Sequence, residues 1–133
     1  MRAAQDLYEG IEIGEDAPAG LITYMRTDSV RVSDTAMAAV RAFIADQYPK
    51  TYLPATPNAY TSKAARVQDA HEAIRPTDVR RRPEAIQQYL EPDQFRLYQL
   101  IWQRFVASQM NPAIYDMTIV DFDLGRFLLR TTG

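Results

Sequence analysis

Apolar residues recur at helical spacing in four stretches of the chain. Residues 1–10 predict a short helix, and residues 34 to about 48 predict a longer one with Ser33 as its N-cap. Two further helices, over residues 83–90 and 92–110, each begin with a proline, whose missing N–H costs nothing in the first helical turn. Apolar side chains cover so much of the last helix that we expect it to pack on two sides and to anchor the fold.

Other parts of the chain have extended or irregular patterns. Residues 21–25 form an apolar run of strand-like or buried extended character, and residues 50–67 predict a long irregular loop, a type of segment that often carries function. Near the C-terminus Val120, Phe122 and Leu124 alternate with two aspartates, which predicts one or two strands. A two-stranded sheet is marginal by itself, so these strands need a partner sheet. Together with the uncapped first helix, they suggest a sequence cut from a longer protein.

Composition narrows the class of protein. With 133 residues, 47% of them hydrophobic and 24% charged, the chain is expected to form one globular unit rather than a disordered or fibrous one. It has no cysteine and one histidine, which excludes disulfides, thiolate catalysis and metal sites rich in Cys or His. No apolar stretch is long enough to span a membrane or to act as a signal peptide, so we expect a cytoplasmic protein without a membrane partner.

Charge is nearly balanced overall but uneven along the chain. The formal net charge is −2, which argues against a surface that coats nucleic acid. Within residues 63–82, however, basic side chains outnumber acidic ones: Lys63, Arg66, Arg75, Arg80, Arg81 and Arg82 against Asp69, Glu72 and Asp78. This segment could contact DNA phosphates. The alternative, equally open, is that residues 80–82 form only a solvated face before a helix.

The sequence GLITYMRTDS places Tyr24 two residues before Arg26. In an extended backbone these two side chains share a face. A phenol is a weak nucleophile at neutral pH, but a nearby guanidinium favours the phenolate and stabilises charge on a phosphate under attack. The alternative is that Tyr24 only packs in the core, because Tyr-x-Arg is a common pattern.

The sequence QDAHEAIRPTD contains the single histidine of the chain, His71. Pro76 disfavours a helical conformation at Arg75, which should therefore lie on an extended exit. With Asp69, Glu72 and Arg75 close in sequence, His71 could contact a phosphate or handle a proton, because a carboxylate fixes the tautomer of an imidazole. The alternative is a hydrogen-bonded polar residue without a catalytic role.

Together the two motifs resemble the central region of the bacterial type IA DNA topoisomerases. The similarity begins at the AQDLY stretch of residues 4–8 and continues through LIWQRF at residues 100–105 to residue 110, so it covers most of the chain. Glu72 and Arg75 occupy positions at which the topoisomerase III branch tends to have proline and isoleucine, and this favours the topoisomerase I branch.

The resemblance implies covalent catalysis of a DNA strand break. Tyr24 would attack a single DNA strand and stay bound to its 5′ phosphate, Arg26 would assist, and His71 would lie near the scissile phosphate. Because the phosphotyrosine retains the bond energy, the strand can be resealed without ATP, and negatively supercoiled DNA is relaxed. The expected DNA-binding residues are Lys63, Arg75, Arg80, Arg81 and Arg82.

The same resemblance implies a mainly helical domain over residues 1–112, similar to winged-helix or catabolite-activator-like domains. Residues 113–133 would form a short β segment of a neighbouring arch domain. Magnesium would be held in the intact enzyme by an acidic domain that this sequence lacks. We therefore expect no metal ligand here, and we expect Asp121 and Asp123 to face solvent as structural residues despite their Asp-x-Asp spacing.

Single-stranded DNA and the remaining domains of the same enzyme are the expected partners, and the expected location is the nucleoid of the cytoplasm. The chain alone should be inactive, because it lacks the acidic domain. Two alternatives from other classes stay open. One is a non-catalytic helical DNA-binding or protein-interaction module with Tyr24 in its core and residues 80–82 on phosphates. The other is a purely structural helical domain, as composition alone would suggest.

Overall fold

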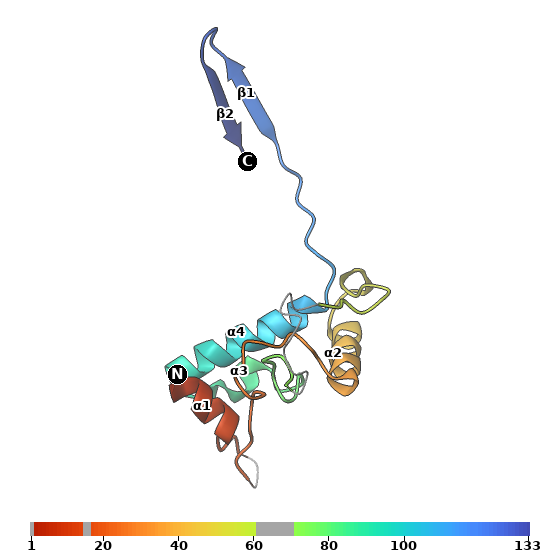
Figure 1. Cartoon of the computed structure of the whole chain (residues 1–133), viewed down its shortest axis with the longest axis vertical. Helices are drawn as coiled ribbons and strands as arrows, with labels where there is room; N and C mark the ends of the chain where they lie inside the picture. Colours follow the sequence, from red (N-terminus) through yellow and green to blue (C-terminus); the bar gives the residue numbers. More distant parts are fainter. Residues whose placement is uncertain (1, 15–16, 61–70) are drawn as a thin grey trace.

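Most of the secondary structure is helical (Figure 1). The computed structural model describes residues 2–14, 17–60 and 71–133. In these ranges the helices are α1 (Arg2–Glu9), α2 (Asp34–Gln47), α3 (Pro83–Ile86) and α4 (Pro92–Ser108), with 3-10 turns at Lys50–Tyr52 and Gln87–Tyr89, and the strands are β1 (Ile119–Asp123) and β2 (Leu128–Thr132). None of these helices is long and apolar enough to cross a membrane. The predicted mainly helical chain with a short C-terminal β segment is confirmed.

Helix α4 carries the central stripe of the core. Its buried apolar residues are Tyr98, Trp102, Phe105 and Val106. They recur every three or four positions and therefore lie on one side of the helix. On the opposite side Leu100 is 53% exposed. The expectation that α4 packs on two sides is wrong, because Leu97 and Ile101 only widen the stripe as partly buried flanks.

A capping box explains why α4 begins at Pro92. The side chain of Glu91 accepts the backbone N–H of Gln94, and the side chain of Gln94 accepts the backbone N–H of Glu91 at 3.0 Å. Gln94 also donates a hydrogen bond to Asp6 of α1 at 3.1 Å. The first turn of α4 is thereby attached to α1.

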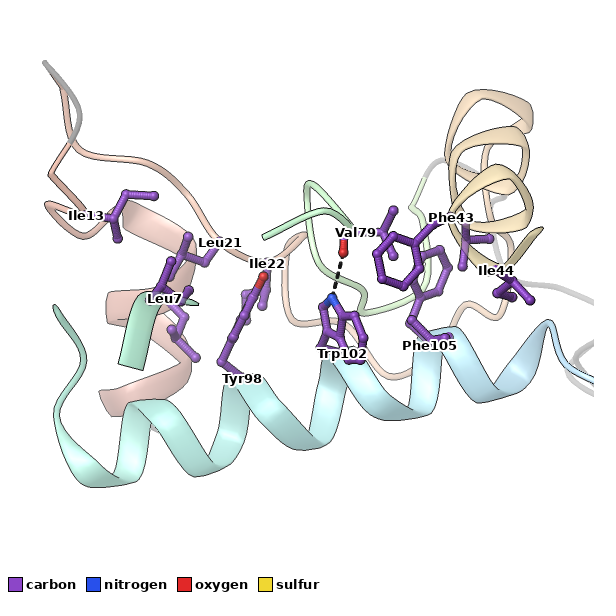
Figure 2. Packing of buried hydrophobic residues seen from close by; sticks show 13 residues of the cluster. Leu7, Ile13, Leu21, Ile22, Phe43, Ile44, Val79, Tyr98, Trp102 and Phe105 are labelled. Atoms are coloured by element: carbon purple, nitrogen blue, oxygen red, sulfur yellow. Dashed lines mark hydrogen bonds between the residues drawn. The ribbon is translucent and has the colours of Figure 1, made fainter. Parts of the chain in front are cut away.

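Segments from the N-terminal half of the chain cover the buried stripe (Figure 2). Helix α1 and the extended residues 21–22 lie toward the end that holds Tyr98, and α2 lies toward the end that holds Phe105. The rings of Phe43 and Trp102 meet edge to face, with their centroids 5.6 Å apart. The core is therefore a row of contacts along α4 rather than a cluster around one point.

Two polar groups on α4 bind the backbone that precedes α3. Trp102 donates its indole N–H to the carbonyl of Val79 at 2.8 Å, and the hydroxyl of Tyr98 donates to the carbonyl of Arg81 at 2.7 Å. Burial raises the pKa of Tyr98, so this phenol stays protonated and acts as a donor. Residues 79–81 are thus fixed on the core by hydrogen bonds as well as by packing.

Helix α2 agrees with its predicted extent but not with its predicted cap. It covers Asp34–Gln47 and ends before Pro49. Ser33 occupies the N-cap position, yet its side chain makes no capping hydrogen bond. Ser33 instead hydrogen-bonds Glu72 with both its side chain and its backbone. The serine therefore links the start of α2 to the motif that contains His71.

A polar lock formed by Asn58 and Gln109 closes the end of α4. Asn58 donates its side-chain amide to the carbonyls of Ser108 and Met110, each at 3.0 Å. The buried Gln109 donates to the carbonyl of Asn58 at 3.0 Å and accepts its N–H at 3.1 Å. The lock supplies donors to carbonyls at the end of a helix, which have no partner within the helix itself.

Beyond the lock, an extended segment leads to the β1–β2 hairpin, which projects away from the helices (Figure 1). The strands are antiparallel, with Ile119 opposite Thr132, and Gly125 lies in the connecting turn with φ +78°. Residues 111–133 are all exposed, and the described part of the chain provides no further strand to pair with the hairpin. The assignment of residues 113–133 to a neighbouring domain stays a prediction.

The two aspartates of β1 have local partners. Asp121 accepts hydrogen bonds from the guanidinium of Arg130 at 2.7 and 2.9 Å, and this contact lowers the pKa of Asp121. Asp123 accepts the N–H of Gly125 at 2.9 Å. Both aspartates are exposed, as expected, and both contribute to the structure of the hairpin.

The hydrogen bond of Trp102 is expected to contribute measurably to stability. Trp102→Phe keeps an aromatic ring but leaves the carbonyl of Val79 without its donor, so the free energy of unfolding should fall by about 1–3 kcal/mol. Urea unfolding followed by circular dichroism measures this change. Leu100→Ala, on the exposed side of the same helix, is the control and should change the value by less than about 0.5 kcal/mol. Equal losses in the two variants would contradict the assignment of the core.

Candidate active site

The two motifs of the sequence lie side by side as extended segments. The N–H of Thr23 donates to the carbonyl of Arg75 at 2.9 Å, and the N–H of Thr77 donates to the carbonyl of Leu21 at 3.0 Å. Between them Ile22 and Pro76 form a single antiparallel bridge. The predicted strand-like run is thus an extended segment rather than a strand of a sheet. Proline has no N–H to donate, which limits the ladder at this point.

The side chain of Thr23 strengthens this pairing. Its hydroxyl donates to the carbonyl of Ala73 at 2.7 Å and accepts the N–H of Arg75 at 3.0 Å. One side chain thus satisfies two backbone groups of the opposite segment. Thr23 directly precedes Tyr24, and Ala73 lies two residues after His71, so the threonine fixes the distance between the two motifs.

Tyr24, Arg26 and His71 come together beside this pairing. One terminal nitrogen of the Arg26 guanidinium lies 3.3 Å from Nδ1 and 3.5 Å from Nε2 of His71. A guanidinium can only donate, so the imidazole nitrogen acts as the acceptor. The rings of Tyr24 and His71 have centroids 6.3 Å apart. The three residues predicted to be catalytic therefore form one cluster.

The cluster is open to solvent. The side chain of Tyr24 is 48% exposed, and its hydroxyl makes no hydrogen bond within the described residues. Arg26 is exposed as well, and His71 is partly buried. The alternative that Tyr24 packs in the core is wrong. The phenol of Tyr24 and the guanidinium of Arg26 are therefore accessible to a substrate.

Arg75 and Glu72, in the same motif as His71, form an ion pair. The guanidinium of Arg75 donates to the carboxylate of Glu72 from Nε at 2.9 Å and also from Nη2, and it donates to the carbonyl of Pro76 at 3.0 Å. Burial raises the pKa of Glu72, but the hydrogen bonds from Ser33 and Arg75 outweigh it and lower the pKa overall. Arg75, a candidate DNA contact, is therefore engaged in holding its own segment.

The other candidate DNA-binding residues have separate surroundings. Arg80 and Arg82 are exposed, and Arg82 lies 4.0 Å from the carboxylate of Glu84. Arg81 is partly buried, with its carbonyl bound to Tyr98. Lys63 lies outside the described residues, as does the start of the histidine motif at residues 68–70. In the arginine triplet, Arg80 and Arg82 are therefore more exposed than Arg81.

Two residues beside this site, Thr23 and Tyr8, are not predicted by any local pattern in the sequence. Thr23 gave no signal, because its hydroxyl acts on backbone groups 50 and 52 residues away. Tyr8, in the short helix predicted over residues 1–10, is 40% exposed, and its ring lies at 64° to that of Tyr24, with centroids 5.3 Å apart. No local pattern predicts this contact, because a loop folds back between the two residues.

Metal binding has no support in the described part of the chain. It contains no group of three or more His, Asp or Glu side chains that could hold an ion. Asp121 and Asp123 lie on the hairpin, away from the cluster.

This chain is similar to known proteins over its whole length. Residues 1–133 match a family described as DNA topoisomerase. DNA topoisomerase 1 proteins from two strains of Xylella fastidiosa, Temecula1 and 9a5c, are each 50% identical over 134 residues, which is 100% of this chain and 16% of their own length. Full-length topoisomerase I from Thermotoga maritima matches in structure with a TM-score of 0.77 and 42% identity, over 99% of this chain and 20% of that one. The chain thus spans a small part of the length of its relatives.

Removal of the Thr23 hydroxyl should separate the two motifs. Thr23→Val keeps the shape of the side chain but leaves the N–H of Arg75 and the carbonyl of Ala73 without a partner, so the free energy of unfolding should fall by about 1–3 kcal/mol. The imidazole resonances of His71 in an NMR spectrum should shift at the same time. Thr27→Val is the matched control at an exposed position and should change neither quantity. Unchanged His71 resonances in the Thr23 variant would show that the threonine does not position the histidine.

Proposed function

The chain belongs to the bacterial DNA topoisomerase family, and on this premise we propose that it carries the nucleophile of a type IA DNA topoisomerase. The observation that carries the proposal is the cluster of an exposed phenol, a guanidinium and an imidazole, with the guanidinium 3.3 Å from the imidazole. The expected resemblance to bacterial topoisomerase I is confirmed by the comparisons. The roles of the individual residues remain a proposal.

In the proposed reaction the hydroxyl oxygen of Tyr24 attacks a phosphorus atom of a single DNA strand. A bond forms between this oxygen and phosphorus, and the bond from phosphorus to the 3′ oxygen of the neighbouring nucleotide breaks. The phenol loses its proton, the leaving oxygen gains one, and the products are a 5′-phosphotyrosine and a free 3′ hydroxyl. The reverse attack reseals the strand. Since one phosphate ester replaces another, neither direction needs ATP.

Arg26 and His71 are proposed to bind the phosphate under attack. The guanidinium has the planar geometry that fits two oxygens of a phosphate, and Arg26 is exposed. Its partner in this structure is an imidazole nitrogen, a neutral acceptor that a phosphate oxygen can replace. Donors aimed at the phosphate would stabilise the charge that develops in the transition state.

We further propose that single-stranded DNA and the other parts of a larger topoisomerase are the partners of this chain. Relaxation of negatively supercoiled DNA in the cytoplasm is then the activity of the assembled enzyme, and the isolated chain should not perform it. Arg80 and Arg82 are the DNA contacts best supported by exposure, whereas the pairing of Arg75 with Glu72 supports a structural role. The magnesium ion implied by the resemblance stays a prediction about the rest of the enzyme.

Substitution of the proposed nucleophile tests the function directly. In the full-length protein, Tyr24→Phe should abolish the covalent complex with a single-stranded oligonucleotide while binding to that oligonucleotide stays within about twofold, because only one oxygen is removed. A denaturing gel with end-labelled DNA measures the complex. Tyr52→Phe, at a side chain 47% exposed, is the control and should react like the wild type.

The outcome that opposes the proposal is a Tyr24→Phe enzyme that still forms a 5′ covalent complex. The nucleophile would then be another tyrosine. Relaxation of supercoiled plasmid by the isolated chain, lost on Tyr24→Phe, would keep the nucleophile but refute the proposed need for the rest of the enzyme.

The roles proposed for two sets of arginines can be separated by salt dependence. Arg26→Lys keeps the charge but loses the planar donor pair, so cleavage at saturating DNA should fall by about tenfold or more with little change in affinity. Replacing both Arg80 and Arg82 with Gln should weaken DNA binding and reduce the salt dependence of its affinity, with cleavage at saturating DNA unchanged. Fluorescence anisotropy at several salt concentrations and single-turnover cleavage measure the two effects. The opposite pattern would reverse the assignment.

A further inference from the structure

A second tyrosine lies beside the proposed nucleophile. The rings of Tyr8 and Tyr24 are inclined by 64° with centroids 5.3 Å apart, the geometry of a favourable edge-to-face pair. Tyr8 is 40% exposed and Tyr24 is 48% exposed, so neither ring is held by burial in the core. Among the described residues, Tyr8 is the nearer of two aromatic neighbours of the Tyr24 ring, and His71 is the other.

The backbone fixes the position of Tyr8 relative to the Tyr24 segment. The N–H of Leu21 donates to the carbonyl of Leu7 at 2.7 Å, which attaches this segment to the end of α1. A Cβ atom at Gly20 would lie 2.9 Å from the carbonyl oxygen of Tyr8, so only glycine allows this close approach. Leu7 is fully buried, and it anchors α1 in the core. Tyr8 thus directly follows a buried residue of α1, and Tyr24 lies three residues after Leu21, which is hydrogen-bonded to that buried residue.

No hydrogen bond from the described part of the chain fixes the orientation of the Tyr24 ring. Its hydroxyl makes none within the described residues, and the ring of His71 is 6.3 Å away between centroids. A half-exposed side chain without fixed contacts populates several rotamers. A nucleophile must spend its time in the rotamer that aims its oxygen at the phosphorus, since the rate depends on that alignment.

We infer that Tyr8 is a positioning residue for the nucleophile: its ring restrains the ring of Tyr24 in the orientation required for attack on DNA. This inference rests on the proposed function of Tyr24. Tyr8 acts through its ring and not through its hydroxyl, because the contact is between the two rings. It contributes to the rate of cleavage rather than to DNA affinity.

The first test observes the Tyr24 ring without any reaction. The 133-residue chain is labelled with 3-fluorotyrosine, and the Tyr24 signal in the ¹⁹F NMR spectrum is identified by its absence in Tyr24→Phe. Tyr8→Leu should shift this signal, because the ring current of a neighbouring aromatic is lost, and Tyr8→Phe should nearly preserve it. Tyr89→Leu is the matched control, since Tyr89 is 41% exposed and packs against Gly14. A Tyr24 signal that is the same in Tyr8→Leu and Tyr8→Phe would overturn the contact.

The second test measures the consequence for catalysis in the full-length protein. Tyr8→Leu should lower the single-turnover rate of DNA cleavage at saturating oligonucleotide by roughly two- to tenfold, the range expected for one aromatic pair, with an unchanged Kd for DNA. Tyr8→Phe should restore the wild-type rate, and Tyr89→Leu should not lower it.

Three other outcomes would contradict either the role of Tyr8 or the proposed function. If Tyr8→Leu weakens DNA binding as much as it slows cleavage, Tyr8 contacts the DNA and the positioning role is wrong. If Tyr8→Phe is as slow as Tyr8→Leu, the hydroxyl matters and the ring contact is not the cause. A Tyr24→Phe enzyme that still cleaves DNA refutes the proposed function itself, and the NMR comparison still decides whether Tyr8 orders the Tyr24 ring.

Discussion

Two backbone hydrogen bonds and the hydroxyls of Thr23 and Thr77 hold the Tyr24 segment against the His71 segment, and the candidate site depends on this pairing. Neither segment belongs to a helix or to a sheet, so no regular element positions the cluster by itself. The support comes from the two neighbours of the pairing. Leu21 is bound to the end of α1, and the backbone beyond Pro76 is fixed to α4 through Trp102.

In this arrangement a buried apolar core supports a solvent-exposed site. The buried stripe of α4 packs against α1, α2 and the segment that precedes α3. Each of these three elements is connected to residues beside the cluster. α1 supplies Tyr8, the approach to α3 follows the His71 motif, and the start of α2 reaches Glu72 through Ser33. The charged groups stay near solvent, where their desolvation costs little and a polyanionic ligand can approach. The buried core and the candidate site are therefore formed by different residues.

The sequence predicts correctly those elements whose position depends on neighbouring residues in the chain. Helix limits at Pro83 and Pro92 follow from the chemistry of proline, and the alternation at Val120 and Phe122 marks a real strand. The motifs identified Tyr24, Arg26 and His71 as candidates, although their proximity arises from pairing across 50 residues. Local rules failed where tertiary contacts decide. Ser33 bonds to Glu72 instead of capping α2, and Leu100 is exposed despite its apolar character, because the core reaches only one side of α4.

The sequence separation of the paired segments has a consequence for folding. A loop of 50 residues must close before the hydroxyl of Thr23 meets the carbonyl of Ala73, and that loop contains the whole of α2. Closing it costs chain entropy that only long-range contacts repay, so such contacts form late compared with the turns of α4. The cluster consequently assembles after the helices that support it, and any partly folded form that retains only local helices has no site.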